Sequence, residues 1–581
     1  MKKISRRSFM QLVGAASAAG ALAACGGGSD ASSTAGSAAG GASNAGAAGG
    51  TPTITFYPSA ANVSSGTVGG YKGEYFASRG FNLEVWAYSD ERTNAILASG
   101  DLPDVMFIPE DSLDVMIQGG MLLNLDDYMD KLPHLQAFEA SATALNYVRA
   151  YKSAGTNGVY GIPTSIGDNY NKFLYQDSTE RNAVKLRWDV YEQIGAPAIN
   201  SMDDLLDVME QMMAAKPTED DGTPNFGTVL NSGSDTSYWA CMVMWYRMQG
   251  YKEDQLGYLL EMDMVNGTVS SILSKDSMYY KGLQWYNEAY RRGLVDPDSI
   301  SNDRATQKVK VDSGYAMIPS GYLPGWAPKY QPYLVPGTKV YYNASRPYGD
   351  SAYMIGINAK TQNLDACLAY LDMLSDPDAY LVVNSGPDGE FWASDSEGNA
   401  FLTEEGLAWL EGGNASVVDF EMSTGEKIEY WNTPWIIWNG TLSSYGDGEG
   451  EKRCCYTSAW KELNEISTNN DLYHQWQDTV GYETWADWLE AEGAFADSSD
   501  LDYISSFTSL PDDMMQLTID AIRDKVVNAS WRMVYAEDQA TFDAEWDQMI
   551  ADCEGLDAQS VIDWRLADIQ NALSIRDSLQ A

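Results

Sequence analysis

Residues 98–108 read ASGDLPDVMFI and end in a short, mostly apolar segment, Asp104–Ile108. A segment of this length and composition is typical of a strand buried in the middle of a sheet. Two other strands are expected before it. Thr53–Tyr57 is a short apolar segment that ends in turn residues, and residues 81–86 show the alternation of a half-buried strand. Helix-like stretches lie between and after them, and this strand–helix–strand spacing predicts a parallel α/β organisation.

The middle of the chain is predicted to be mostly helical. One helix starts at Ser201, which with Asp204 resembles a capping box, and ends before Lys216-Pro217. Its methionines and leucines recur on one face, which is expected to pack in the core. A second helix stops at the basic turn Arg291-Arg292-Gly293.

The later part of the chain adds a strand at Tyr353–Asn358 and a helix for which Asn363 is the expected N-cap. The C-terminal part is helical again, with Trp546, Ile550 and Trp564 among its apolar positions. No period of roughly 20–50 residues repeats, so a solenoid is not indicated.

Composition limits the class of protein. The chain has 581 residues, with 82 Asp and Glu against 37 Lys and Arg, and a formal net charge of −45. At roughly 100–200 residues per domain, more than one core is expected. So large a negative charge repels phosphates, which argues against nucleic acid as a partner. His134 and His474 are the only histidines, which excludes a His-rich metal centre and leaves few candidates for a catalytic triad.

The first fifty residues resemble an export signal followed by a linker. Residues 1–24 combine a basic region that contains Arg6-Arg7, as in twin-arginine signals, with a short apolar stretch. Leu22–Cys25 resembles the bacterial lipobox, in which the cysteine is acylated; an ordinary secretory signal is the alternative. Residues 26–50 are almost all Gly, Ala and Ser and are expected to be a flexible tether. We therefore expect Cys25 to anchor the body, by lipid, to the outer face of the bacterial cytoplasmic membrane.

The other cysteines point to neither a zinc site nor a disulfide framework. Cys241 and Cys367 lie in apolar helical patterns, and Cys454 and Cys455 are adjacent. Because Cys553 leaves an odd number and no CxxC has metal spacing, structural thiols are the expected state.

Several segments, taken in order, carry a family resemblance. Residues 98–105 resemble a small-Gly-Asp-x-Pro-Asp-apolar motif, Tyr160–Pro163 a hinge crossing, and residues 351–358 the return crossing. Residues 186–191, which run into the Ser201 helix, are similar to an RWD motif, and residues 286–299 to a Y-N-E…G-L-x-D-P helix end. Together they resemble the extracellular solute-binding proteins (family 1) of ABC importers, in the lipoprotein branch related to maltose-binding protein. The likeness spans about residues 51–580.

The resemblance implies an α/β, two-lobed, periplasmic-binding-protein-like fold (type 2) with hinge-connected lobes, an interlobe cleft and extra C-terminal helices. Lobe one is expected at 51–161 and 352–440, and lobe two at 162–351 and 441–581. The implied function is capture of a solute by hinge closure for an ABC permease in the membrane. The implied protein is a monomer without catalysis, cofactor or metal.

A carbohydrate, in particular an oligosaccharide, is the expected ligand, because aromatic rings stack on sugar faces and carboxylates accept their hydroxyls. Tyr57 ends the first strand, and ligands of α/β sheets lie beyond the carboxyl ends of strands. Glu110 and Asp111 resemble the family's acidic sugar-binding loop. For each aromatic candidate the alternative is a place in the core. The further aromatic candidates are Trp239, Tyr322, Trp326 and Trp392.

A calcium site, a different activity and a different ligand are the further possibilities that the sequence raises. The loop Glu219–Asn225 lacks the ligand spacing of an EF-hand and contains Pro224, so a turn is expected rather than a calcium site. A cell-surface glycoside hydrolase needs only two suitably spaced carboxylates, which an acidic chain does not exclude. The same fold binding a peptide or another polar solute also stays open.

Overall fold

The structure, a computed structural model, divides into two compact units. Unit 1 comprises Met1–Asp168, Arg346–Gly406 and Val417–Tyr445, and unit 2 comprises Asn169–Ser345, Leu407–Ser416 and Gly446–Ala581. The residues that the structure describes are 50–58, 65–138, 140–168, 183–232, 240–254, 256–320, 329–341, 345–396, 400–412, 414, 417–429, 431, 435–437, 470–496, 501 and 504–580.

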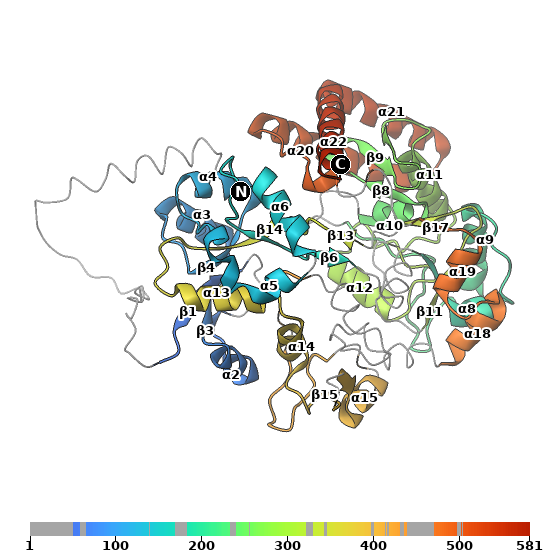
Figure 1. Cartoon of the computed structure of the whole chain (residues 1–581). Helices are drawn as coiled ribbons and strands as arrows, with labels where there is room; N and C mark the ends of the chain where they lie inside the picture. The colour runs from blue at the N-terminus through green and yellow to red at the C-terminus, as the bar shows by residue number, and fades with distance from the viewer. Residues whose placement is uncertain are drawn as a thin grey trace, which may run out of the picture. The chain divides into compact units, whose positions relative to one another are not determined.

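Unit 1 is built on a six-stranded sheet with the order β2-β3-β1-β4-β14-β5 (Figure 1). Strand β1 pairs in parallel with β3 and β4, which confirms the parallel organisation predicted for the N-terminal part. Strand β14 is antiparallel to both β4 and β5, so the sheet is mixed. The strands are β2 (Gly66–Thr67), β3 (Asn82–Val85), β1 (Thr53–Tyr57), β4 (Val105–Ile108), β14 (Asp350–Ile357) and β5 (Ile162–Thr164).

Helices cover this sheet, and aromatic side chains fill the space between the layers. Phe56 of β1 and Phe81 each lie 5.5 Å, between ring centroids, from Tyr370 of α13, and all three side chains are fully buried. The described helices, 3-10 turns and small hairpin of unit 1 are α2 (Gly70–Ser78), α3 (Asp90–Ser99), η2 (Glu110–Ser112), α4 (Leu113–Gln118), η3 (Leu125–Lys131), α5 (Pro133–Ala137), α6 (Ser141–Tyr151), α13 (Leu364–Met373), α14 (Pro377–Ser385), β15 (Trp392–Ser394) and β16 (Ala400–Leu402). Helix α15 (Glu404–Glu411) begins in unit 1 and continues into unit 2.

Unit 2 contains several small sheets among many helices. Strand β7 pairs antiparallel with β11, β9 lies between β8 and β10, and β12 pairs in parallel with β17. The strands are β7 (Val184–Arg187), β8 (Tyr251–Glu253), β9 (Leu260–Asp263), β10 (Thr268–Ser271), β11 (Tyr330–Tyr333), β12 (Val340–Tyr341) and β17 (Phe495–Ala496). The short strands β6 (Gly167–Asp168) and β13 (Ser345–Arg346) occur where the chain passes from one unit to the other.

Among the described residues, the helices of unit 2 begin with α8 (Trp188–Gln193) and α9 (Met202–Ala215), and the predicted start of α9 at Ser201 is confirmed. The Ser201 hydroxyl accepts a hydrogen bond from the backbone N–H of Asp204 at 3.1 Å. The apolar face of α9 is buried, as expected. The remaining helices are α10 (Ala240–Met248), η4 (Leu256–Tyr258), α11 (Met278–Arg291), α12 (Arg304–Asp312), α18 (Asp471–Val480), α19 (Trp485–Ala491), η6 (Ile504–Ser506), α20 (Asp513–Val534), α21 (Gln539–Gly555) and α22 (Ala558–Gln580).

The prediction for Asn363 was only half right. This residue occupies the N-cap position of α13, but its side chain makes no capping hydrogen bond. Its Nδ2 instead donates to the carbonyl of Thr53 at 3.3 Å. The Asn363 side chain therefore bonds to the first strand instead of capping α13.

The three C-terminal helices, drawn in red in Figure 1, pack onto α11 and the neighbouring part of unit 2. The side-chain amide of Asn287, on α11, donates to three backbone carbonyls at the end of α20 and just beyond it, at 2.8–3.1 Å. Arg565 of α22 binds Asp254 through two hydrogen bonds of 2.7 and 2.9 Å, with both residues buried. Polar contacts between buried groups therefore hold these helices in place.

The buried thiols fit the expectation from sequence. Cys241, Cys367 and Cys553 are buried and unbridged, and Cys454 and Cys455 lie outside the described residues.

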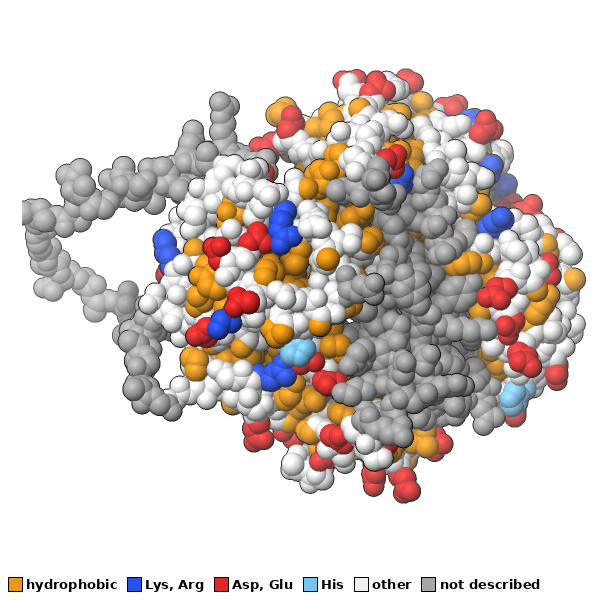
Figure 2. Space-filling view, in the orientation of Figure 1, with side chains coloured by type: hydrophobic (Ala, Val, Ile, Leu, Met, Phe, Trp, Pro, Cys, Tyr) orange, Lys and Arg blue, Asp and Glu red, His pale blue; other side chains and the backbone are white. Residues whose placement is uncertain are grey.

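Nowhere in the described part of the chain does a helix have both the length and the apolar character that a membrane crossing requires. Figure 2 shows acidic side chains scattered over the visible described surface, with basic ones at fewer places.

Replacing Arg565 with methionine is expected to lower the free energy of unfolding by about 3–5 kcal/mol, because the buried carboxylate of Asp254 loses its partner. The exposed pair of Lys275 and Asp547, 3.9 Å apart, provides the control. Lys275→Met should cost less than about 1 kcal/mol. Urea unfolding of both variants checks this, and equal losses would contradict it.

Candidate functional site

The carboxyl ends of four strands meet at one edge of the unit 1 sheet. Strands β1, β3 and β4 are parallel, and β5 runs in the same direction because β14 is antiparallel to both β4 and β5. Ligands of open α/β sheets bind beyond the carboxyl ends of the strands. The segments that follow these four strands therefore form the candidate site in unit 1.

Tyr57 lies at this edge, but its side chain is only 1% exposed. Its hydroxyl donates to the carbonyl of Ser89 at 3.0 Å and lies 2.7 Å from the hydroxyl of Thr93. The ring packs on Tyr88, with 5.8 Å between centroids. In this conformation Tyr57 supports the turn between β3 and α3. Direct contact with a ligand stays a prediction.

The turn that Tyr57 supports carries two half-buried aromatic side chains that the sequence reasoning did not select. Trp86 directly follows β3, and the guanidinium of Arg92 lies 4.6 Å from the centre of its ring. Tyr88 donates its hydroxyl to a carboxylate oxygen of Asp90 at 3.0 Å. For Tyr88 the signal was present, because Tyr88 follows the predicted strand 81–86 just as Glu110 follows Asp104–Ile108, whereas Trp86 was placed inside that strand.

Glu110 and Asp111 lie in η2, immediately after β4 and Pro109, at the same edge. The ammonium of Lys152 donates to Glu110 at 3.0 Å. Burial lowers the pKa of Lys152, but Tyr147 and Glu110 outweigh it and leave that pKa raised, so the ammonium of Lys152 keeps its charge at neutral pH. Asp111 is exposed and accepts from the hydroxyl of Ser112 at 3.0 Å. The turn η2 therefore presents one paired and one solvent-facing carboxylate.

Trp392 lies in β15, away from these strand ends in sequence and pairing. It is 5% exposed, and its indole N–H donates to the carbonyl of Gly386 at 2.8 Å. Its contact with a ligand stays a prediction. Trp239, Tyr322 and Trp326, and the predicted lipidation site Cys25, lie outside the described residues.

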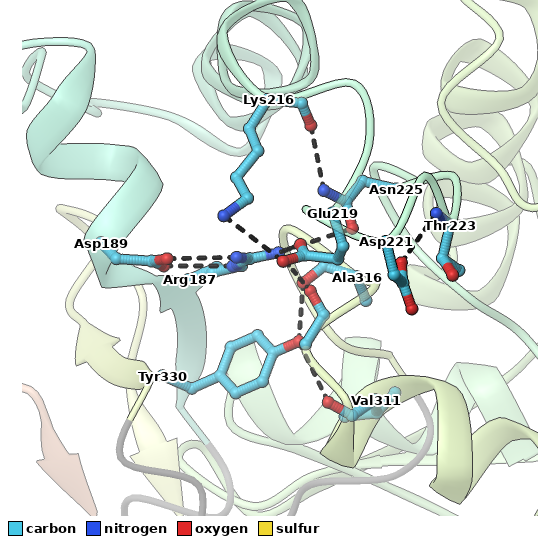
Figure 3. Close-up of polar contacts among 11 residues, drawn as sticks. Arg187, Asp189, Lys216, Glu219, Asp221, Thr223, Asn225, Val311, Ala316 and Tyr330 are labelled. Carbon is cyan, nitrogen blue, oxygen red and sulfur yellow. Dashed lines mark hydrogen bonds and ion pairs between the residues drawn. The ribbon is translucent and has the colours of Figure 1, made fainter.

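Unit 2 contains a buried charged cluster around Arg187, the last residue of β7 (Figure 3). Its guanidinium, fully buried, makes two 3.1 Å hydrogen bonds to Asp189 and a further one to Glu219. It also donates to the carbonyl of Gly314 at 2.5 Å. The planar fork of arginine suits this set of oxygen acceptors.

The Arg187 cluster includes a residue of the loop Glu219–Asn225, for which the sequence predicted a turn rather than a calcium site. Glu219 is the first residue of this loop, and its carboxylate pairs with Arg187 and, at 3.3 Å, with Lys216. Asp221 accepts from the backbone N–H of Thr223 at 2.9 Å, which confirms a turn. Within the described residues, no group of three or more His, Cys, Asp or Glu side chains could hold a metal ion. An arginine side chain thus neutralises Glu219.

Glu219→Gln should lower the free energy of unfolding by removing the ion pair with Arg187, and the size of this loss should depend on pH. Burial raises the pKa of Glu219, but hydrogen bonds from Arg187 and Asn225 and the charge of Arg187 outweigh it and hold that pKa at about 2, below its ordinary 4.5. The contribution is therefore complete above pH 4.5 and is lost as the pH falls towards 2. It amounts to at most about 3 kcal/mol.

Urea unfolding of the wild type and of Glu219→Gln at a series of pH values checks this. The difference in unfolding free energy between the two proteins should shrink as the pH falls from about 5 to about 3. A difference that stays constant over this range would show that Arg187 does not hold Glu219 ionised.

Comparisons with known proteins concern the fold of this chain. No protein-family model and no curated protein matches the chain. An extracellular solute-binding protein from Bifidobacterium longum subsp. infantis matches with 16% identity and a TM-score of 0.57, over 91% of this chain and 99% of its own. An HMO-binding, ABC-transporter-associated solute-binding protein from Bifidobacterium longum infantis matches with 16% identity and a TM-score of 0.57, over 90% and 100%.

A third match is the S. pneumoniae ABC-transporter substrate-binding protein FusA, as an EF-hand mutant in complex with fructo-nystose. It has 14% identity and a TM-score of 0.58, over 91% of this chain and 99% of its own. At such identities the likeness concerns the fold. This chain has the two-lobed α/β fold of extracellular solute-binding proteins, as the sequence predicted.

Proposed function

We propose that this chain is an extracellular substrate-binding protein that captures a carbohydrate, in particular an oligosaccharide, for an ABC importer. The observation that carries the proposal is the fold, shared over nine-tenths of the chain with solute-binding proteins. Two of those proteins are described as HMO-binding and as bound to fructo-nystose. The proposed protein is a monomer, binds without catalysis, and has a membrane permease as its partner.

The carboxyl edge of the unit 1 sheet supports a neutral, hydroxyl-rich ligand. Trp86 and Tyr88 provide half-buried rings on which the C–H face of a sugar can stack. Glu110 and Asp111 provide carboxylate oxygens that accept hydroxyl hydrogens, and Lys152 keeps Glu110 oriented. Capture then proceeds by hinge closure, in which the bound solute shifts an open–closed equilibrium that the permease senses.

Export and anchoring complete the proposal. The signal-like residues 1–24, the lipobox cysteine Cys25 and the Gly/Ala/Ser-rich residues 26–50 support attachment to the outer face of the cytoplasmic membrane. Radioactive palmitate should label the wild type, and Cys25→Ala should abolish labelling and release the protein into the medium. Labelling that survives this substitution would rule out the lipobox.

Carbohydrate binding is expected to raise the melting temperature of the protein. A ligand at 100 times its Kd adds about 2.7 kcal/mol of stability. A thermal-shift screen against mono- and oligosaccharides, with kestose and fructo-nystose included, and against a peptide library checks this. A shift with peptides alone would overturn the carbohydrate assignment, and release of shorter sugars during incubation would replace it with glycoside hydrolysis.

Trp86→Ala should weaken the binding of the sugar found in this screen by about tenfold, equivalent to about 1.4 kcal/mol, because a stacking surface is lost. The matched control is Tyr75→Ala. Tyr75 is also half-buried beneath an arginine, Arg79, at 6.0 Å, but it lies within α2 rather than after a strand. Isothermal titration should show unchanged affinity for that control, and an equal loss in both would contradict the placement of the ligand.

A further inference from the structure

The last turn of α6 carries one end of a row of three tyrosine rings in unit 1. The ring of Tyr147 lies 5.2 Å from that of Tyr348 and 5.9 Å from that of Tyr151, between centroids. Tyr348 is 5% exposed and Tyr147 is 1% exposed, whereas Tyr151, the last residue of α6, is 39% exposed. The row therefore starts in the core and ends in a ring that faces solvent.

Two contacts place this end of α6 at the carboxyl edge of the unit 1 sheet. Lys152, the residue after Tyr151, donates to Glu110, which follows the carboxyl end of β4. Tyr348 lies two residues before β14, and β14 is antiparallel to β4, so its first residues lie at the edge where β4 ends. Tyr151 therefore belongs to the same edge as Glu110, although no sequence motif singled it out.

Tyr151 and Trp86 lie on opposite sides of Glu110 along this edge. The strands follow one another in the order β3-β1-β4-β14-β5, Trp86 follows β3, and α6 packs against β5. Neighbouring strands are about 4.8 Å apart, so β3 is about 14 Å from β14 and about 19 Å from β5. A sugar unit in an extended chain covers about the same distance as one strand spacing. The two aromatic surfaces are thus several sugar units apart.

The surroundings of Tyr151 distinguish it from an ordinary surface residue, because a single exposed aromatic side chain would by itself need no explanation. Its ring rests on a buried ring, which itself rests on another. A tyrosine ring held in this way offers a flat apolar face at little cost in conformational entropy. Beside it, the Glu110 carboxylate and the Lys152 ammonium, on side chains that are 30% and 16% exposed, can bond to hydroxyl groups.

We propose that Tyr151 is a second stacking surface for the solute, on the β5 side of Glu110, and that the ligand is an extended oligosaccharide of at least three sugar units that reaches from Trp86 to Tyr151. This inference rests on the proposed function and narrows its ligand. A monosaccharide or a disaccharide is too short to occupy both aromatic surfaces, so the affinity depends on chain length.

Phe401 provides a matched control for Tyr151. These two are the exposed large apolar side chains among the described residues of unit 1, at 43% and 39%. Phe401 lies in the hairpin of β15 and β16, which is a separate two-stranded sheet, and Figure 1 shows β15 and α6 far apart within unit 1. Tyr151→Ala and Phe401→Ala therefore remove rings of similar exposure, one at the carboxyl edge and one away from it.

Binding of sugars of increasing length tests the inference. A glycan array of mono- to hexasaccharides finds a series that the full-length wild type binds, and isothermal titration then compares the members of that series. Tyr151→Ala should weaken the binding of a tetrasaccharide about fivefold and that of a disaccharide less than about twofold. Phe401→Ala should leave every affinity unchanged, and Tyr151→Phe should retain the wild-type affinities because it keeps the ring.

The outcomes separate this inference from the proposed function. If sugars bind but Tyr151→Ala behaves like Phe401→Ala, the second stacking surface is refuted and the proposed function stands. An equal loss at all chain lengths would also refute it, because that result indicates one compact site. If the wild type binds no glycan on the array, the proposed function fails and this inference fails with it.

Thermal melting shows whether a loss of binding reflects a loss of folding. Because both rings are exposed, Tyr151→Ala and Phe401→Ala should melt at the same temperature as the wild type. If Tyr151→Ala melts lower, Tyr151→Leu replaces it in the titrations, since leucine keeps apolar packing on Tyr147 without a flat ring. The same dependence on chain length is expected for that variant, and its absence would overturn the inference.

Discussion

The alignment of the unit 1 sheet depends on one carboxylate, that of Asp104. Its Oδ2 accepts hydrogen bonds from the backbone N–H and the hydroxyl of Thr55, at 2.9 and 3.0 Å. Its Oδ1 accepts a hydrogen bond, at 2.5 Å, from the hydroxyl of Thr361, a residue just before α13. These contacts join β1, β4 and the segment after β14 at the point where β1 and β4 begin to pair. A carboxylate is suited to this place because it accepts several donors at once. The register that follows brings Tyr57 and Glu110 to the same edge.

In unit 2 a buried cation, Arg187, joins separate segments of the chain, as the carboxylate of Asp104 does in unit 1. Its guanidinium donates hydrogen bonds to Asp189 at the start of α8, to Glu219 at the start of its loop and to the carbonyl of Gly314. Because a buried charge is tolerated only when it is paired, this arrangement fixes three segments relative to one another. Arg565 does the same for the C-terminal helices through Asp254 and Asp568. In a chain with far more acids than bases, individual basic residues therefore organise the fold.

Local sequence patterns predicted the helices and strands well, but they did not predict the contacts between these elements. The strands around residues 98–108 and the capped start of α9 follow from short-range preferences that tertiary packing leaves intact. Trp86 was overlooked because its alternation with Val85 was read as strand periodicity, although β3 ends at Val85. Asn363 lost its capping bond to a carbonyl of the first strand, a partner far away in sequence. The pairing of Glu219 with Arg187 joins residues 32 positions apart, which no local pattern reveals.

The charges at the carboxyl edge of unit 1, the proposed ligand site, limit the kind of solute that would bind there. Glu110 is paired with Lys152, and the cation of Arg92 lies over the ring of Trp86. The remaining carboxylates at the edge, Asp111 and the Asp90 that Tyr88 contacts, are hydrogen-bond acceptors. An anionic solute would meet these acceptors in a chain whose net charge is −45, so it would be repelled. A neutral polyol supplies hydroxyl donors to the carboxylates and an apolar face to the rings, and it meets no such penalty.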